Sequence, residues 1–222
     1  PCKNAEEPYY RSWEKYKGYR QKLCVHYLPT GIIPQVFKED RIIIREKLGI
    51  PSNAFVISFV GRHNTVKGYD RLVSLYEKLD DIYFVCCGKK SDISYPNSNR
   101  WIEIGWTNDP YSYVNASDLF VLPNRETYFD LSLLQTISIG KRALISNTGG
   151  NKYFSGKEEM GIYLFDNIED AVQKIKTIKG CEQTDAEKRM LISYFEDNFK
   201  SNIFFKKYID ILNDIYEAKR IK

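Results

Sequence analysis

The segment Asp118–Phe154 limits the fold most tightly, because it predicts a strand, a turn, a helix, a second strand and a glycine turn in immediate succession. The first strand is the apolar run Leu119–Leu122, which a Pro-Asn pair ends. Apolar residues at helical spacing then predict a helix over 131–140, and its final glycine is well placed to end it. The second strand begins with Ala143–Ile145, and a Gly-Gly pair closes it.

A strand, a helix and a strand in this order predict a right-handed crossover in a parallel sheet. In such sheets, ligands bind outside the carboxyl ends of the strands. Polar residues and glycines follow both strands here, namely Asn124, Arg125 and Glu126 after the first and Asn147, Thr148, Gly149 and Gly150 after the second. The segment therefore places groups able to bind a polar ligand at the edge where a ligand is expected.

The same alternation runs through the centre of the chain. The predicted strands there are Leu23–Leu28, Ala54–Val60, Ile82–Cys87 and Trp101–Ile104, and the predicted helices are Lys38–Gly49, Leu72–Leu79 and Pro110–Asn115. Strands that alternate with helices predict a doubly wound α/β domain. Its parallel sheet should be covered by helices on both faces.

Both ends of the chain predict helices outside this alternation. An aromatic helical face near the N-terminus is made of Tyr9, Trp13, Tyr16 and Arg20, and such a face more often packs against protein than binds sugar. Near the C-terminus, Thr184 and Glu187 form a capping box that opens a helix. We therefore divide the chain into a helical or linker segment at 1–22, the α/β domain at 23–180, and C-terminal helices at 181–222 that pack on the domain or on protein outside this chain.

Composition limits the functions open to the chain. Of its 222 residues, 43% are hydrophobic, which supports a substantial core and excludes general disorder. The net charge of +4 suits an anionic small ligand or a weak preference for a membrane surface, and it does not indicate a nucleic-acid partner. No apolar run approaches the roughly 20 residues of a membrane span, and no signal peptide is visible.

Cysteine usage indicates a reducing compartment. The chain has five cysteines without a CxxC pair and only two histidines, which disfavours a zinc site and favours reduced thiols. We therefore expect a cytoplasmic protein. Because the first residue is proline rather than methionine, we also expect the chain to be cut from a longer one.

A second informative motif is GRHNTVKG, which runs from Gly61 to Gly68 between a buried strand and a helix. Two cations in it, Arg62 and Lys67, can converge on one anion, and the helix N-terminus adds backbone donors. A diphosphate fits this arrangement, with a bidentate contact from arginine and a point-charge contact from lysine. The alternative is a solvated turn with two ordinary surface charges. We interpret His63 as a loop residue and not as a general base.

These residues carry a resemblance to a known family. From about Tyr27 to the C-terminus, the chain resembles the donor-binding C-terminal half of GT-B glycosyltransferases of the large retaining family four, also called glycosyl transferases group 1. YLPTGIIPQVF resembles the family's P-N-G-I-D…F segment, and REKLGIP with VISFVGRHNTVKGYD resembles its R…LGI…GR…KG.D block. WIEIGW, NASDLFVLPNRETYFDLSLLQTISIG and the GG pair resemble the segments that follow in the family.

The resemblance implies a Rossmann-like doubly wound sheet and a set of site residues. Arg62 and Lys67, with Gly61 before them, match the pair that binds the donor's diphosphate. Phe129-Asp130-Leu131 matches F-G-L, whose backbone donors face the phosphate and sugar. The remaining matches are Trp106 and Thr107 in the loop that frames the nucleobase, Gly149 and Gly150 at the GG pair, and Glu126 as a candidate for holding the sugar hydroxyls.

The sequence departs from the family pattern where two glutamates are expected. Alignment on Phe129 puts Thr127 at the first position and Gln135 at the second, where the family's glutamate accepts from both ribose hydroxyls. Gln135 can still accept through its carbonyl oxygen, but more weakly. Asp130 replaces the middle glycine of F-G-L and brings a carboxylate near a diphosphate. These changes predict a reduced affinity for the nucleotide.

The resemblance implies that the donor is a nucleotide-diphosphate sugar, most simply a UDP-sugar, and that the acceptor is a glycan, lipid or protein. It implies no metal and no other cofactor, because the two cations stabilise the leaving diphosphate. With the acceptor-binding half absent, we expect this chain alone to be inactive, and the full-length protein to associate peripherally with membranes in polysaccharide biosynthesis. The alternative is a degenerate, non-catalytic GT-B subunit that stabilises a partner glycosyltransferase; a plain nucleotide-binding α/β module is more distant.

Overall fold

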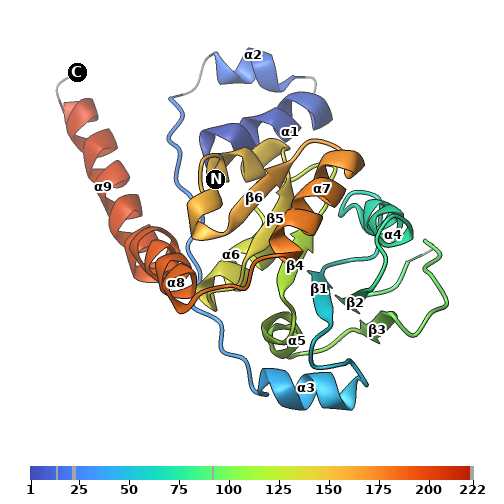
Figure 1. The fold of residues 1–222 in the computed structure, drawn as a ribbon. Coiled ribbons are helices and arrows are strands. Elements are labelled where there is room, and N and C mark those ends of the chain that lie inside the picture. Colours follow the sequence, from blue (N-terminus) through green and yellow to red (C-terminus); the bar gives the residue numbers. More distant parts are fainter. Residues whose placement is uncertain (14, 22–23, 92, 221–222) are drawn as a thin grey trace.

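The computed structural model describes residues 1–13, 15–21, 24–91 and 93–220. Its core is a six-stranded sheet in the order β3-β2-β1-β4-β5-β6, and every neighbouring pair is parallel (Figure 1). The strands are β1 Phe55–Val60, β2 Ile82–Cys87, β3 Trp101–Gly105, β4 Leu119–Leu122, β5 Ala143–Ser146 and β6 Ile162–Phe165. The doubly wound α/β fold predicted from the sequence is thereby confirmed.

Nine α-helices and three short 3-10 helices connect or flank these strands within the described residues. The α-helices are α1 Glu6–Ser12, α2 Tyr16–Arg20, α3 Arg41–Lys47, α4 Tyr69–Glu77, α5 Pro110–Ala116, α6 Leu131–Ser138, α7 Ile168–Lys179, α8 Asp185–Phe199 and α9 Ser201–Arg220. The 3-10 helices are η1 Lys3–Ala5, η2 Gly149–Phe154 and η3 Glu158–Met160. The capping box predicted at Thr184 is present and opens α8.

Two predictions were wrong. The expected strand Leu23–Leu28 does not form over its described part, Cys24–Leu28, which runs as irregular chain. Among the described residues near this segment, the one β-bridge joins Ile32 to Lys200. The N-terminal aromatic residues do not share one helix either: Trp13 ends α1 with extended backbone, so Tyr9 and Tyr16 meet from two separate helices.

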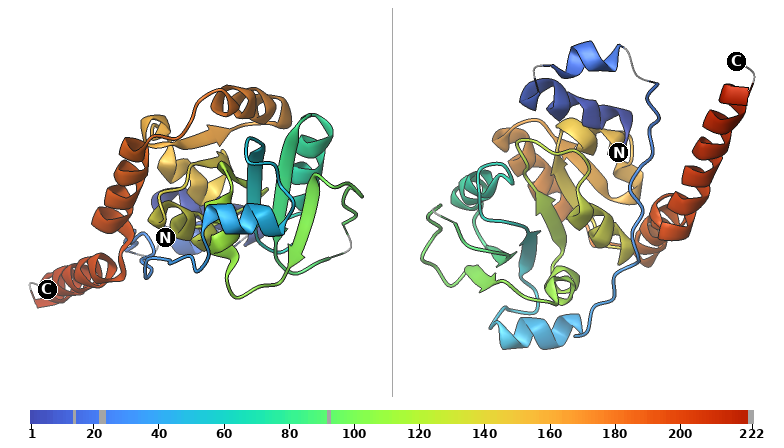
Figure 2. Two further views of the ribbon diagram at one scale, coloured as in Figure 1. Left: turned by 60° about the horizontal axis from the view of Figure 1, so that its bottom comes forward. Right: turned by 180° about the vertical axis from the view of Figure 1, so that it is seen from behind.

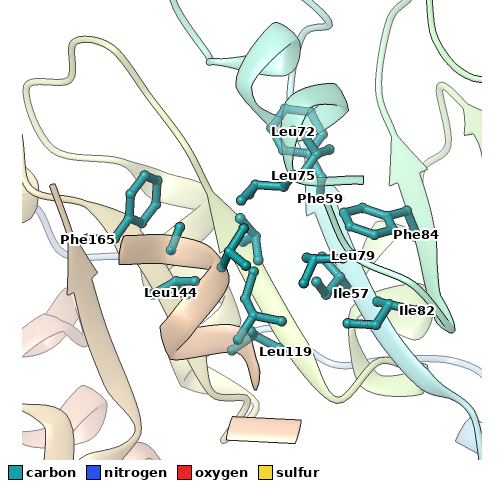
Figure 3. Packing of buried hydrophobic residues seen from close by; sticks show 14 of the residues in the cluster. Ile57, Phe59, Leu72, Leu75, Leu79, Ile82, Phe84, Leu119, Leu144 and Phe165 are labelled. Atoms are coloured by element: carbon teal, nitrogen blue, oxygen red, sulfur yellow. The ribbon is translucent and has the colours of Figure 1, made fainter. Parts of the chain in front are cut away.

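Alternate side chains of the strands fill hydrophobic clusters on both faces of the sheet. On one face, α4 and α7 pack over the strands, and Figure 3 shows Leu72 and Leu75 of α4 directed at this core. The core on that face includes Ile57, Phe59, Leu119, Leu144 and Phe165. On the other face, α5, α6 and α8 cover Phe120, Leu122, Ala143 and Ile145. The strands are therefore mostly apolar, with Ser58 in β1, Glu103 in β3 and Ser146 in β5 as polar members.

Buried basic side chains cap helix ends at the amino edge of the sheet. Nζ of Lys141 donates to the carbonyl oxygens of Asn115 at 3.1 Å and Ser117 at 2.6 Å, at the C-terminus of α5. Arg142 donates in the same way to the carbonyl oxygen of Cys181, after α7. Unsatisfied carbonyls at helix ends attract such donors, so these basic side chains serve the fold.

The last helix leaves the body of the domain. Figures 1 and 2 show α9 extending away from the sheet, joined to it through α8. Its exposed apolar residues include Phe205, Ile209 and Leu212. Within the described residues, no helix has both the length and the apolar character to cross a membrane.

Candidate functional site

The two loops that carry the predicted site residues meet at the centre of the sheet. β1 and β4 are neighbours, and the connections leave them in opposite directions, towards β2 and towards β5. In open α/β sheets this reversal creates a crevice outside the carboxyl ends of the two strands, where ligands bind. The loop after β1 is 61–68 and the loop after β4 is 123–130. We call the space between them the β1–β4 crevice.

Contacts between the loops fix the walls of the crevice. The amide of Arg125 donates to the carbonyl oxygen of Val66 at 3.0 Å. Gly68 lies so close that a Cβ there would stand 1.9 Å from the carbonyl oxygen of Pro123, and its φ of +70° is in the left-handed region. A glycine is therefore required at 68, for both its backbone angle and the space.

The predicted pair of cations lies in the loop after β1. Asn64 shapes this loop, because its Oδ1 accepts from the amide of Lys67 at 2.9 Å and its carbonyl oxygen accepts from the amide of Tyr69. The side chain of Arg62 is exposed, and it has no ion-pair partner among the described residues. Lys67 is half-buried and turns towards the other loop. The two cations thus stand on one loop, but only arginine is free of a partner.

Asp130 is the partner of Lys67. Its carboxylate caps α6, with Oδ1 accepting from the amide and the hydroxyl of Ser132 at 3.0 and 2.6 Å. Its Oδ2 accepts from Nδ2 of Asn124 at 2.8 Å and from Nζ of Lys67. Burial alone would raise the pKa of Asp130, but the charge of Lys67 and these hydrogen bonds hold it below its ordinary value. The carboxylate is therefore ionised and lies buried between the two loops.

The flanking residues of the F-D-L segment have different surroundings. Phe129 is buried, and its ring stacks with that of Phe154 at 5.8 Å between centroids, so its side chain belongs to the core. Leu131 is 49% exposed and begins α6. The segment thus forms the N-terminus of α6, and the carboxylate of Asp130 caps it.

Gln135 and Glu126 lie on either side of this helix start. Gln135 is half-buried, and its Oε1 accepts a hydrogen bond from the hydroxyl of Tyr111 at 2.6 Å. Glu126 is also half-buried, and its Oε1 has no hydrogen-bond partner among the described residues. A carboxylate oxygen that is buried without a donor is suited to accept from a ligand hydroxyl.

The two glycines after β5 allow a close approach of backbones. A Cβ on Gly149 would stand 2.1 Å from the carbonyl oxygen of Thr127, and one on Gly150 would stand 1.9 Å from that of Tyr128. The amide of Gly150 also donates to the carbonyl oxygen of Thr127 at 3.0 Å. These glycines therefore hold the turn after β5 against the loop that carries Glu126.

The predicted nucleobase loop lies apart from these residues. Trp106 is 79% exposed and follows β3, the edge strand that is two strands from β1. Thr107 accepts through its hydroxyl from the amide of Asp109 at 3.1 Å, which shapes the start of α5. The structure thus places both residues on the carboxyl side of the sheet, after an edge strand two strands from β1.

His63 has a role in the fold that the sequence did not indicate. It is 1% exposed and lies flat on Tyr69, with ring centroids 4.1 Å apart and planes 3° apart. Its Nδ1 stands 3.5 Å from Oε2 of Glu103, and burial holds the pKa of His63 below its ordinary value. Hydrophobic periodicity predicts which side chains of a helix or strand are buried, but it does not apply to a loop. The burial of His63 therefore becomes visible only from its contacts with Tyr69 and Glu103 in the fold.

The N-terminal helices cover part of the same edge. Glu7 of α1 accepts from the amide of Gly149 at 3.3 Å and from Nζ of Lys152 at 2.6 Å. The ring of Tyr9 packs on that of Tyr128, with centroids 4.7 Å apart. Figure 1 shows α1 and α2 above the carboxyl ends of β5 and β6.

Comparisons with known proteins agree on one family. The sequence model described as "Glycosyl transferases group 1" matches residues 40–194. The chain is 29% identical over 154 residues to the UDP-Gal:alpha-D-GlcNAc-diphosphoundecaprenol alpha-1,3-galactosyltransferase of Escherichia coli, a match that covers 60% of this chain and 39% of that protein.

Solved structures show the same fold at low identity. A sucrose-phosphate synthase from Thermosynechococcus elongatus superposes with a TM-score of 0.72 and 16% identity, over 92% of this chain and 57% of that one. The Anabaena protein HepE, in complex with UDP and glucose, superposes with a TM-score of 0.64 and 15% identity, over 84% and 56%. This chain spans less than two thirds of the length of each of these three proteins.

Proposed function

Because the chain belongs to the glycosyl transferases group 1 family and has the Rossmann-like sheet of GT-B glycosyltransferases, we propose that it is the donor-binding half of a retaining glycosyltransferase that uses a UDP-sugar. The observation that carries this proposal is the position of Arg62 and Lys67, on the loop after β1 at the β1–β4 crevice. This crevice is where a doubly wound sheet binds its ligand.

The reaction breaks the bond between the anomeric carbon and the diphosphate. Negative charge builds on the leaving phosphate oxygens, and preorganised donors at that point lower the barrier. The exposed guanidinium of Arg62 can make two parallel hydrogen bonds to a phosphate. The ammonium of Lys67, which has three donors, can bond a phosphate oxygen while it keeps Asp130. Glu126, with an unpartnered carboxylate oxygen, is the candidate for holding the sugar hydroxyls.

Two similar proteins support uracil as the nucleobase. The Escherichia coli relative is named as a UDP-galactose-dependent transferase, and HepE was solved with UDP and glucose. Trp106 and Thr107, after β3, are proposed to frame that base. The acceptor named for the Escherichia coli relative is a lipid-linked sugar, so a glycan or lipid acceptor is proposed here, with peripheral contact to a membrane.

The acceptor site is proposed to lie in the part of the protein that this chain does not include. The chain covers 39% of the Escherichia coli relative, which leaves room for a second domain of similar size. The exposed apolar face of α9, with Phe205 and Ile209, is the surface we propose to pack on that domain. The chain alone then supplies the donor half of the cleft and not the acceptor half.

Calorimetric titration with UDP and GDP tests the donor site. We expect UDP to bind in the millimolar range or tighter, and Arg62→Ala to weaken that binding at least tenfold because a charge-assisted bidentate contact is lost. Lys188→Ala is the matched control, since it removes a cation on α8 beside a different cavity, which Lys141 and Arg142 line at the amino edge of the sheet. Absence of heat with both nucleotides at millimolar concentration would rule out the proposal.

A second function is favoured by two contacts. Lys67 is already paired with Asp130, and Oε1 of Gln135 is already used by Tyr111. A degenerate GT-B subunit that stabilises a partner glycosyltransferase would show such occupied groups. An assay of the full-length protein distinguishes the two functions. An active enzyme transfers sugar from a UDP-sugar without a partner, whereas a degenerate subunit only raises the rate at which a partner glycosyltransferase transfers sugar.

A further inference from the structure

The carboxylate of Asp130 is surrounded by the groups that would bind a phosphate in the β1–β4 crevice. It takes the ammonium of Lys67, the amide and hydroxyl of Ser132 at the start of α6, and the side-chain amide of Asn124. These donors come from three separate segments, the loop after β1, the loop after β4 and the helix itself. An ammonium, a helix N-terminal amide and a hydroxyl are the donors of anion sites.

We propose that Asp130 is a built-in counter-anion that sets the affinity of the donor site: its carboxylate occupies the anion position at the N-terminus of α6 and competes with the donor's diphosphate. This inference deepens the proposed donor-binding function and rests on it. The F-G-L resemblance implies that residue 130 contributes only its backbone to the donor site. In this proposal, the carboxylate of Asp130 instead takes the place of a phosphate of the ligand.

Burial makes the competition strong. Asp130 is 6% exposed and Asn124 is fully buried, so the field of the carboxylate is weakly screened by water. A diphosphate that enters the crevice meets a lysine whose charge is already compensated. Arg62 is then the one cation of the pair that remains uncompensated. The site should therefore bind a nucleoside diphosphate less tightly than it could with an uncharged side chain at 130.

The substitution Asp130→Asn isolates the charge. The new amide has the same size, and its oxygen can still accept from the amide of Ser132, because asparagine caps helices as well as aspartate does. The amide of Asn124 can turn to present its oxygen, which has no hydrogen-bond partner among the described residues, to the new nitrogen. The cap and the packing are thus kept while Lys67 is released to the ligand.

The test compares UDP with uridine on wild type, Asp130→Asn and Asp170→Asn. Asp170 is the matched control, because its carboxylate lies in the first turn of α7, pairs with Lys174 and follows β6, two strands from β4. We expect Asp130→Asn to bind UDP about tenfold more tightly, with uridine binding unchanged and the control like wild type. Asp130→Gly, which removes the side chain, should show the same direction and serves if the amide variant does not fold.

The outcomes separate the inference from the function beneath it. UDP binding that is unchanged in Asp130→Asn, or weaker, overturns the inference and leaves the donor site standing; weaker binding would show that the carboxylate orients Lys67 instead. Tighter binding of uridine as well as UDP also overturns it, because a charge effect requires the phosphates. If neither folded wild type nor either variant binds UDP, the donor-site proposal fails and the inference fails with it.

Discussion

The hydroxyl of Tyr111 donates to Oε1 of Gln135 over 2.6 Å, which uses one of the two lone pairs of the oxygen that the family resemblance assigns to a ribose. Tyr111 is 5% exposed and comes from α5, so the bond joins two helices on the same face of the sheet. An amide has one oxygen, whereas a carboxylate has two. The remaining group of Gln135 is an NH2 donor, which cannot replace an acceptor for two ribose hydroxyls.

Gln135→Glu should therefore tighten nucleotide binding. One oxygen can keep the bond from Tyr111, and the other becomes free for the ribose with a charge-assisted hydrogen bond. The expected gain is about 1 kcal/mol, roughly fivefold in affinity for UDP and for uridine alike. Calorimetry at pH 7.5 measures it, with Tyr111→Phe as the control that frees the native amide oxygen. Unchanged or weaker binding would mean that Gln135 does not face the ribose.

Gly68→Ala should destabilise the domain far more than Gly49→Ala. Both glycines have left-handed backbone, with φ of +70° and +65°, but a Cβ at 68 would collide with the carbonyl of Pro123 whereas one at 49 meets open space. We expect losses in the free energy of unfolding of about 2–4 kcal/mol at 68 and about 1 kcal/mol at 49. Urea denaturation measures both. Equal losses would contradict the close approach of the two crevice loops.

Lys141 should make stability depend on pH above neutrality. Burial lowers its pKa to about 7, against about 10.4 in the unfolded chain, so between these values the unfolded chain binds more protons and stability rises with pH. The neutral amine keeps both hydrogen bonds to carbonyls. The free energy of unfolding of wild type minus that of Lys141→Met should increase from pH 7 to pH 10, by at most about 1.4 kcal/mol per pH unit. A difference that stays flat would show that Lys141 is charged in the fold.

The isolated chain should transfer no sugar to an added acceptor. It supplies Arg62 and Lys67 for the donor, but the acceptor site is proposed to lie in the part of the protein outside it. The measurement is product formation from UDP-galactose and UDP-glucose with lipid-linked and free saccharide acceptors. Robust transfer by residues 1–222 would refute the division of the active site between two halves.

The sequence predicted the strands of this fold well, because each is a local apolar run. β2 has the predicted bounds, and β1 and β3 differ by one residue at one end. β6 and α7 were not predicted. The segment Leu23–Leu28 has the composition of a strand. A strand forms only where a neighbouring strand offers backbone groups for pairing, and composition does not reveal that neighbour.

The sequence named candidate site residues but not the contacts between them. Arg62, Lys67 and Asp130 were all named from the sequence, yet the bond between Lys67 and Asp130 joins residues 63 positions apart. The bond between Tyr111 and Gln135 crosses 24 positions in the same way. Periodicity and motif spacing describe neighbours along the chain, so contacts that decide charge and hydrogen bonding between loops come only from the fold.

The most direct test is a crystal structure of the chain in complex with UDP. A second structure, of Asp130→Asn with UDP, should contain the more tightly bound nucleotide. We expect the diphosphate to bind in the β1–β4 crevice, within hydrogen-bond distance of Arg62 and Lys67, with the uracil towards Trp106. A diphosphate bound at any other place, such as the amino edge beside Lys141 and Arg142, would contradict this expectation.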